Sequence, residues 1–200
     1  MTITLYHCPG SRSSGMLFLL EELGQPYEIK FIDVRAGAGQ TPEFLAINPM
    51  GKVPAIKDGD DIVWESGAIC LYLADKYPSA GLTASIGAPS RAQLLRWLFF
   101  AASIDTVLVE RMLHRAPFPG QSVGYGDFER VINQVLRRGL ADANPWLLGD
   151  QFSVADIGIG AGIPWGLMNG TLPRESPFTD YAARIEARPA YQRGRARDAG

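Results

Sequence analysis

The repeat pattern of apolar residues changes once along this chain, near residue 80, and the change limits the folds open to it. Before that point, short β-prone runs alternate with helical repeats, whereas beyond about residue 90 only helical repeats occur. Residues 79–89, between the two patterns, are rich in Gly, Ala, Ser and Pro, as linkers are. We therefore expect an α/β domain over residues 1–78 and an all-helical domain over residues 90–200.

The first part is expected to follow the order β-α-β-α-β-β-α. Strands are expected at residues 3–6, 27–34, 53–56 and 62–64, and helices at residues 16–23, from Thr41 onward and at 66–76. The first two strands are joined by a helix long enough for a parallel crossover, and the turn-forming residues 57–61 indicate a hairpin between the last two.

Four helices are expected in the second part, over residues 90–115, 127–143, 154–169 and 178–187. Ser153 and Asp156 have the spacing of a capping box at the start of the third, which gives the acid a structural role. Arginines crowd the end of the chain, which indicates a solvated last helix with a frayed tail.

Composition narrows the class of protein. The apolar fraction is 46%, the charged fraction 20% and the net charge -2, so no overall charge recruits nucleic acid or an anionic membrane. Two cysteines, Cys8 and Cys70, make no disulfide framework. The N-terminal residues do not read as a signal peptide, and there is no apolar run of about 18 residues, so we expect a cytoplasmic protein without a membrane span.

Two segments of the first part combine features of a site for a zwitterionic peptide. Pro54 stands at the mouth of a strand; if the Val53–Pro54 bond is cis, the backbone of Val53 is free to pair with an extended peptide, whereas a trans proline would merely start an edge strand. Ser66 is suited to capping a helix, and the free amides there also suit a carboxylate, while Glu65 supplies charge for an ammonium.

A third segment, residues 7–14, joins the first strand to the first helix and contains three serines. Hydroxyls and amides at such a helix start stabilise an anion, including a thiolate. Any of the serines could instead be the helix cap.

The order and spacing of these segments resemble those of the glutathione S-transferase family, over essentially the whole length. The matching residues are 5–14, the run from Asn48–Pro49 to Val53–Pro54, residues 65–73, and residues 149–156 in the second part. The resemblance is to the bacterial-type, cytosolic, serine-dependent members. It implies a thioredoxin-like N-terminal domain, a helical C-terminal domain, glutathione as substrate, no metal and a homodimer.

The resemblance also implies a role for each residue of the site. Pro54 corresponds to the cis-proline and Val53 to the backbone partner of the cysteinyl part of glutathione. Glu65 and Ser66 hold the γ-glutamyl end, and Lys52 helps to bind a carboxylate. Across the dimer, Ser103 or Asp105 is implied to reach the glutathione of the neighbouring subunit.

The thiol can be activated by a hydroxyl alone. Lowering its pKa by two units requires about 2.7 kcal/mol, and one hydrogen bond to a charged group contributes roughly 1.5–3 kcal/mol. In the family the donor is a Tyr, Ser or Cys of the first strand–helix loop. Ser11 matches the serine position and Ser13 competes with it, whereas Tyr6 falls within the strand and reads as structural.

Conjugation of the glutathione thiolate to a small apolar electrophile is therefore the leading hypothesis. The electrophile is expected between the two domains, where Trp97, Phe100, Met112 and Trp165 either line its site or belong to the core. His7 borders the expected pocket and is a candidate contact for this second substrate. Disulfide or peroxide reduction through Cys8 is the second hypothesis, and a non-catalytic glutathione-binding or protein-binding module the third.

Overall fold

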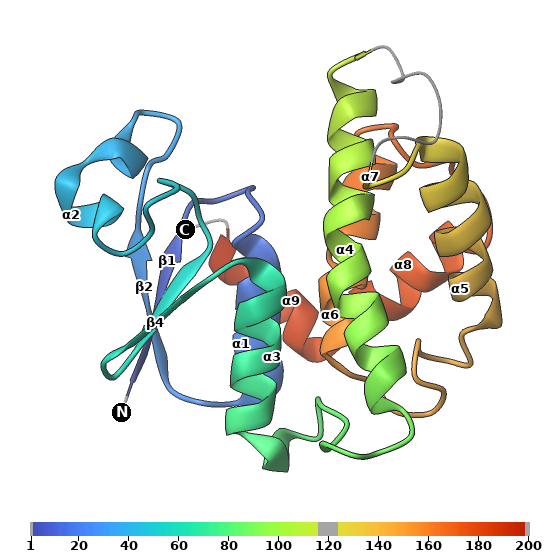
Figure 1. Cartoon of the computed structure of the whole chain (residues 1–200), viewed down its shortest axis with the longest axis horizontal. Coiled ribbons are helices and arrows are strands. Elements are labelled where there is room, and N and C mark those ends of the chain that lie inside the picture. The colour runs from blue at the N-terminus through green and yellow to red at the C-terminus, as the bar shows by residue number, and fades with distance from the viewer. Residues whose placement is uncertain (1, 116–123, 199–200) are drawn as a thin grey trace. The chain divides into compact units, whose positions relative to one another are not determined.

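A computed structural model of the chain describes residues 2–115 and 124–198 (Figure 1). The chain divides into two compact units. The first comprises Met1–Ala80 together with Ala187–Gly200, and the second comprises Gly81–Glu186. The prediction gave residues 90–200 to one helical domain; residues 187–198 instead pack with the first unit, because the last helix lies on the first one.

The first unit contains a four-stranded mixed sheet in the order β2-β1-β3-β4. β1 (Ile3–His7) pairs with β2 (Tyr27–Phe31) in parallel, across the crossover helix α1 (Ser14–Leu23). β3 (Ala55–Asp58) pairs antiparallel with both β1 and β4 (Asp61–Trp64), and α3 (Ser66–Lys76) follows. Short helical segments complete it: η1 (Ala38–Gln40), α2 (Pro42–Leu45) and η2 (Pro78–Ala80). The predicted thioredoxin-like α/β fold is confirmed.

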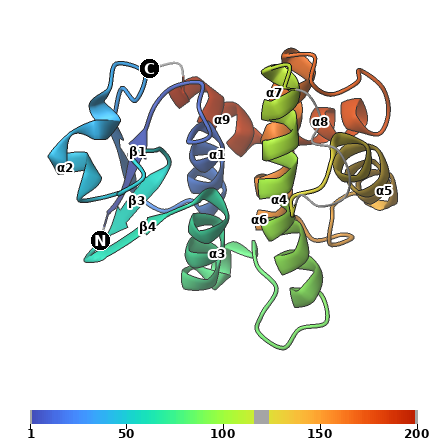
Figure 2. The ribbon, with the colours of Figure 1, turned by 45° about the horizontal axis from the view of Figure 1, so that its top comes forward.

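Alternation along β1 divides its side chains between the two faces of the sheet. α1, α3 and the last helix, α9 (Pro189–Asp198), lie together on one side of the sheet (Figures 1 and 2). Tyr6 points to the other side and joins a buried cluster with Phe44 of α2, at 5.7 Å between ring centroids. His7 follows with the opposite orientation, and so it is buried on the face that α9 covers.

The prediction of a solvated last helix holds only for the outer face of α9, where most of the arginines are exposed; its inner face is packed. α9 packs along α1, and at Gly194 a side chain would place its Cβ 2.9 Å from the backbone nitrogen of Phe18. Arg188 forms an ion pair with Glu22 of α1, and Arg193 forms one with Glu21. The arginines that gave the segment its polar pattern are thus partly used to hold it against another helix.

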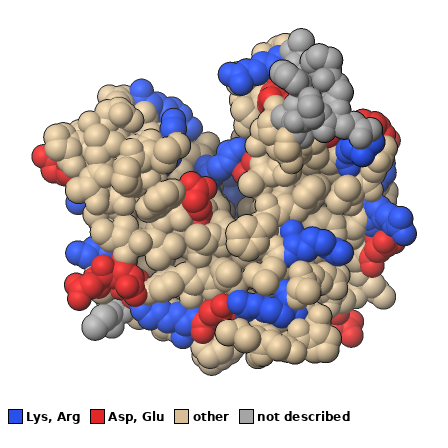
Figure 3. Space-filling model, viewed as in Figure 1, with Lys and Arg blue, Asp and Glu red and all other residues tan. Residues whose placement is uncertain are grey.

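The second unit is mostly helical. Its elements are α4 (Arg91–Met112), η3 (Glu129–Leu136) continued by α5 (Arg137–Asp142), α6 (Val154–Gly160), α7 (Gly162–Met168) and α8 (Phe178–Glu186). α4 packs against α6 and η3, and it is long and apolar enough to pass for a membrane span by length and composition, as core helices of globular proteins also are. The face of the molecule in Figure 3 carries acidic and basic side chains interspersed.

The capping box predicted at the start of α6 is confirmed. The Ser153 side chain accepts from the backbone of the first turn, and the carboxylate of Asp156 accepts from the Ser153 amide at 2.8 Å. Asp156 also accepts from the amide of Leu147 and from the hydroxyl of Tyr181. Burial raises the pKa of Asp156, and these hydrogen bonds oppose the rise. The acid therefore organises the helical unit and has no exposed face for catalysis.

Candidate functional site

The register of the sheet brings the three predicted segments together at one end. Tyr6 of β1 pairs with Ala55 of β3, and Ala55 pairs with Trp64 of β4. Because both pairings are antiparallel, the residues that follow Tyr6, precede Ala55 and follow Trp64 all leave the sheet at the same end. Residues 7–14, called the serine loop from here on, are therefore neighbours of Val53–Pro54 and Glu65–Ser66 through the strand pairing alone.

The Val53–Pro54 peptide bond is cis, which confirms the cis-proline expected from the family resemblance. Pro54 is buried and Val53 is half-buried. Among residues 2–115 and 124–198, no hydrogen bond engages the backbone N–H or C=O of Val53. The preceding turn is fixed by Asn48, whose side chain donates to the carbonyl of Lys52 at 2.7 Å and accepts from Met50 at 3.0 Å. Asn48 thus orients the strand mouth, a role that its sequence position did not reveal.

Glu65 and Ser66 occupy the start of α3, but not as predicted. Ser66 is the first helical residue, and the N-cap position belongs to Glu65, whose side chain makes no capping hydrogen bond. The first amide to find a helical partner is that of Ile69, which donates to the Glu65 carbonyl at 2.9 Å. The amides of the first turn are therefore available to an anion, and the exposed Glu65 carboxylate stands beside them.

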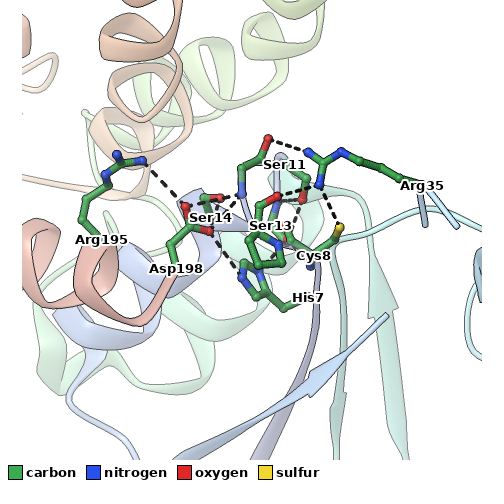
Figure 4. Close-up of polar contacts among 10 residues, drawn as sticks. His7, Cys8, Ser11, Ser13, Ser14, Arg35, Arg195 and Asp198 are labelled. Carbon is green, nitrogen blue, oxygen red and sulfur yellow. Dashed lines mark hydrogen bonds and ion pairs between the residues drawn. The ribbon is translucent and has the colours of Figure 1, made fainter. Parts of the chain in front are cut away.

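The two candidate serines differ in their surroundings (Figure 4). Ser13 is completely buried, at 0% exposure, and its hydroxyl is the centre of a hydrogen-bonded cluster. It accepts from the amide of Cys8 at 3.1 Å and contacts Ser11 Oγ and His7 Nδ1, each at 2.7 Å. Ser11 is half-buried, and its hydroxyl also accepts from the Ser13 amide at 3.2 Å.

The cluster continues from Ser13 to the end of the chain. His7 is buried, and its Nε2 lies 3.3 Å from Oδ1 of Asp198 in α9, a charge contact that lacks hydrogen-bond geometry. Asp198 also accepts from the Ser14 hydroxyl and from the Gly10 amide, so the carboxylate is fixed to the serine loop. Burial lowers the pKa of His7, and the charge of Asp198 raises it in opposition.

Cys8 is placed as a packing residue. It is 1% exposed, and Arg35 donates to its sulfur at 3.3 Å and to the carbonyl of Pro9 at 2.9 Å. The guanidinium therefore covers the sulfur and holds the loop. Cys70 is also buried, and burial raises the pKa of its thiol to about 12.

The remaining candidates lie elsewhere. Tyr6 is 5% exposed within its aromatic cluster, and burial raises its pKa, which agrees with a structural role. Trp97 packs on Gly139, where a Cβ would come within 2.1 Å of its ring, so it belongs to the core of the second unit. Ser103 and Asp105 are half-buried on α4. Phe100, Trp165 and Met112 also belong to the second unit, where Phe100 and Trp165 are half-buried and Met112 is exposed.

Two contributors to this site were missed from the sequence, Arg35 and Asp198. Arg35 follows β2 and Asp198 ends α9, and neither lies in a motif that marks it. Their hydrogen bonds to the serine loop span 25 to 27 and 184 to 188 positions of the chain.

Comparison with known proteins agrees with this architecture. Residues 1–75 match the family profile of the glutathione S-transferase N-terminal domain. Glutathione S-transferase 2 of Schizosaccharomyces pombe is 33% identical over 187 residues, which cover 88% of this chain and 79% of that protein.

Solved structures agree as well. A glutathione transferase from Methylococcus capsulatus superposes with a TM-score of 0.83 at 29% identity, covering 99% of both chains. A glutathione transferase homologue from Sulfitobacter with bound glutathione gives a TM-score of 0.76 at 27% identity, covering 98% of both chains. Sequence, fold and the arrangement of the three segments lead to one assignment: the chain belongs to the glutathione S-transferase family.

Proposed function

We propose that this protein is a glutathione transferase that joins the glutathione thiolate to small apolar electrophiles. The observation that carries the proposal is that three features meet at one end of the sheet. They are the unpaired backbone of Val53 before β3, the N-terminus of α3 with the Glu65 carboxylate, and the serine loop with its hydroxyls. These three features are complementary to the three parts of glutathione: an extended peptide, a zwitterionic end and a thiol.

Each end of glutathione has a partner in this scheme. The Val53 backbone pairs with the cysteinyl residue, and Glu65 binds the γ-glutamyl ammonium. The amides and hydroxyl at Ser66 bind the γ-glutamyl carboxylate, and the exposed Lys52 attracts the carboxylate at the other end. The glutathione held in the Sulfitobacter homologue supports binding of the same ligand here.

Ser11 is the hydroxyl that we propose to meet the sulfur. Ser13 is fully buried and surrounded by protein partners, whereas Ser11 is half-buried and retains the capacity for one more hydrogen bond. A hydroxyl that must contact a ligand needs that remaining capacity. Burial of Cys8 beneath Arg35 argues against the competing reduction chemistry.

The proposal is tested by titrating bound glutathione through its thiolate absorbance. In the wild type we expect ionisation about one to two pH units below that of the free tripeptide, and in Ser11→Ala a return toward the free value, because a charge-assisted hydrogen bond of roughly 1.5–3 kcal/mol is lost. Turnover of an aromatic halide electrophile should fall in parallel.

Ser90→Ala is the matched control, since Ser90 is also a half-buried serine at a helix start, belongs to the second unit and makes no side-chain capping hydrogen bond. A wild type in which bound glutathione ionises like the free tripeptide would contradict conjugation by this site. Disulfide reduction that disappears only in Cys8→Ala would replace conjugation with the redox hypothesis. Glutathione binding without thiolate formation or turnover would indicate a non-catalytic glutathione-binding module.

We further propose that the protein acts as a cytoplasmic homodimer. Family membership supports this assembly, and Ser103 or Asp105 on α4 is the residue proposed to approach the partner's glutathione.

A further inference from the structure

We propose that His7, held by Asp198, accepts the proton of the glutathione thiol through the hydroxyls of Ser13 and Ser11. This inference rests on the proposed function and gives the site a proton acceptor that a hydroxyl alone does not supply. His7 and Ser13 are positioning and relay residues here, and Ser11 is the group that touches the substrate.

The geometry is a continuous row of four side chains from the loop surface into the protein (Figure 4). Ser11 Oγ lies 2.7 Å from Ser13 Oγ, and Ser13 Oγ lies 2.7 Å from His7 Nδ1. On the far side of the ring, Nε2 lies 3.3 Å from the carboxylate of Asp198. A carboxylate, an imidazole and a hydroxyl in this order are the elements with which enzymes activate a nucleophile.

The hydrogens can be assigned for the resting state from the partners available. The carboxylate of Asp198 favours a hydrogen on Nε2, so the neutral ring presents a lone pair at Nδ1. Two acceptors are within reach of the Ser13 hydroxyl, the Cys8 carbonyl at 3.2 Å and Nδ1 at 2.7 Å, and we assign its hydrogen to the nearer Nδ1. Ser13 Oγ then accepts from the Cys8 amide and from the Ser11 hydroxyl. Ser11 Oγ accepts from the Ser13 amide, and one lone pair remains for an incoming S–H.

Ionisation reverses the direction of each of these hydrogen bonds. The S–H bond breaks as the proton joins Ser11 Oγ; Ser11 passes its own proton to Ser13, and Ser13 passes its own to His7 Nδ1. The products are a thiolate and an imidazolium. Ser11 now donates to the sulfur, Ser13 donates to Ser11, and His7 donates to Ser13, so every hydroxyl again has its full set of partners.

The charged groups around His7 suit the transfer. Asp198 of α9 faces the ring directly, and Arg195 lies 3.7 Å from the other oxygen of that carboxylate. On the loop side, Arg35 covers Cys8 and the Pro9 carbonyl, and the neutral Ser13 and Ser14 lie at the N-cap and the first position of α1. Burial lowers the pKa of His7, which favours the neutral ring before glutathione binds, and the charge of Asp198 opposes that shift and stabilises the imidazolium once a proton arrives.

The proton's destination distinguishes this relay from activation by a lone hydroxyl. If Ser11 only stabilises the anion, the thiol proton goes to solvent. If the relay operates, the proton stays on His7 until the thioether has formed, and then returns along the same hydroxyls. The two cases give the same thiolate and different proton release.

The first experiment follows the imidazole nitrogens by NMR, using the whole chain. It contains two histidines, His7 and the exposed His114, so His114→Gln leaves one ring signal to observe. Glutathione at neutral pH should convert His7 from the neutral form to the imidazolium. S-methylglutathione, which has no thiol proton, should bind without doing so. A ring that stays neutral while thiolate absorbance appears would overturn the relay.

The second experiment compares thiolate absorbance with proton release on mixing protein and glutathione. The wild type should release close to no proton for each thiolate, whereas His7→Asn should release about one. The asparagine amide can occupy the place of Nδ1 and donate to Ser13. It therefore preserves the hydroxyl orientation of the thiolate state, in which Ser13 donates to Ser11, but it accepts no proton. Asp198→Asn should raise the pKa of the bound thiol by about one unit, a tenfold loss of thiolate at a fixed pH.

Glu22→Gln is the control, because it weakens the contact between α1 and α9 without touching the relay, and it should behave as wild type. Full proton release by the wild type overturns the relay and leaves Ser11 in place. Absence of any thiolate in the wild type instead overturns the proposed function. Should His7→Asn fail to fold, the wild-type proton count and the NMR experiment decide the question by themselves.

Discussion

Glu65, which we propose binds the γ-glutamyl ammonium, has a backbone conformation that residues bearing a Cβ rarely adopt. Its φ is 73° and its ψ 121°, at the N-cap of α3. Such conformations cost about 1–3 kcal/mol and persist where the surroundings impose them. Here the turn out of β4 sets the carboxylate beside the free amides of the first helical turn, so strain and the proposed binding of the γ-glutamyl end coincide in one residue.

Two substitutions at Glu65 separate these contributions. Glu65→Gln removes the charge, so the KM for glutathione should rise about ten- to a hundredfold, the equivalent of one charged hydrogen bond. The variant keeps the Cβ and therefore the backbone strain, so its free energy of unfolding should not change. Glu65→Gly should raise KM similarly and increase the free energy of unfolding by about 1 kcal/mol, because glycine adopts positive φ without strain. Kinetics and urea denaturation check both; equal stability of the two variants would contradict the strain.

At the scale of elements, the contact between α1 and α9 determines how the site is completed. Gly194 lets the two helix backbones approach, and the ion pairs of Glu21 and Glu22 flank that contact. The same packing carries Asp198 to the serine loop at the end of α9. The helix that pairs with α1 by charge therefore also brings the carboxylate that faces His7.

Gly194→Ala tests this packing by the sign of its effect. Helix propensity alone would make alanine stabilising by about 1 kcal/mol in an exposed helix. A Cβ at this position lies 2.9 Å from the Phe18 nitrogen and 3.1 Å from the Leu17 carbonyl carbon, so we expect destabilisation, by about 1–3 kcal/mol for overpacking. Chemical denaturation measures the difference, with Ala196→Ser on the exposed side of α9 as the control. A more stable Gly194→Ala protein would contradict the close approach.

At the scale of the whole molecule, the chain leaves the first unit at Ala80, builds the second, and returns at Ala187. The first unit is therefore completed by a segment that follows the second unit in the sequence. Its buried apolar side chains on α1, such as Phe18, lie under α9 and depend on that return.

A chain ending at Glu186 should accordingly lose stability in the first unit and keep it in the second. Without α9, the face of α1 around Phe18 is exposed to water, and burying one such side chain contributes about 1.5–3 kcal/mol. Hydrogen exchange should become faster in β1 and α1 and remain unchanged in α6 and α8. A separate peptide of residues 187–200 should restore the slow exchange. Unchanged exchange in α1 would show that the first unit does not need α9.

The sequence by itself determined those parts of the protein that depend on local chemistry. The alternation of strands and helices, α3 from Ser66 to Lys76 and the capping box at Ser153 follow from patterns within a few residues, and the structure contains them. Residues Val53–Pro54 and Glu65–Ser66 could be singled out because the role proposed for each depends on its own backbone or charge. Segments 127–143 and 154–169 were recognised as helical, but each contains two helical elements in the structure.

Only the tertiary structure decided which serine is buried, where the last helix packs, and what faces His7. Ser11 and Ser13 are alike in local sequence, and they differ because β1 and α1 enclose one hydroxyl and leave the other half-exposed. Asp198 reaches the loop from 184 to 188 positions away, through a helix whose polar sequence reads as solvated. Burial and long-range pairing depend on packing between distant segments, and no local pattern encodes them.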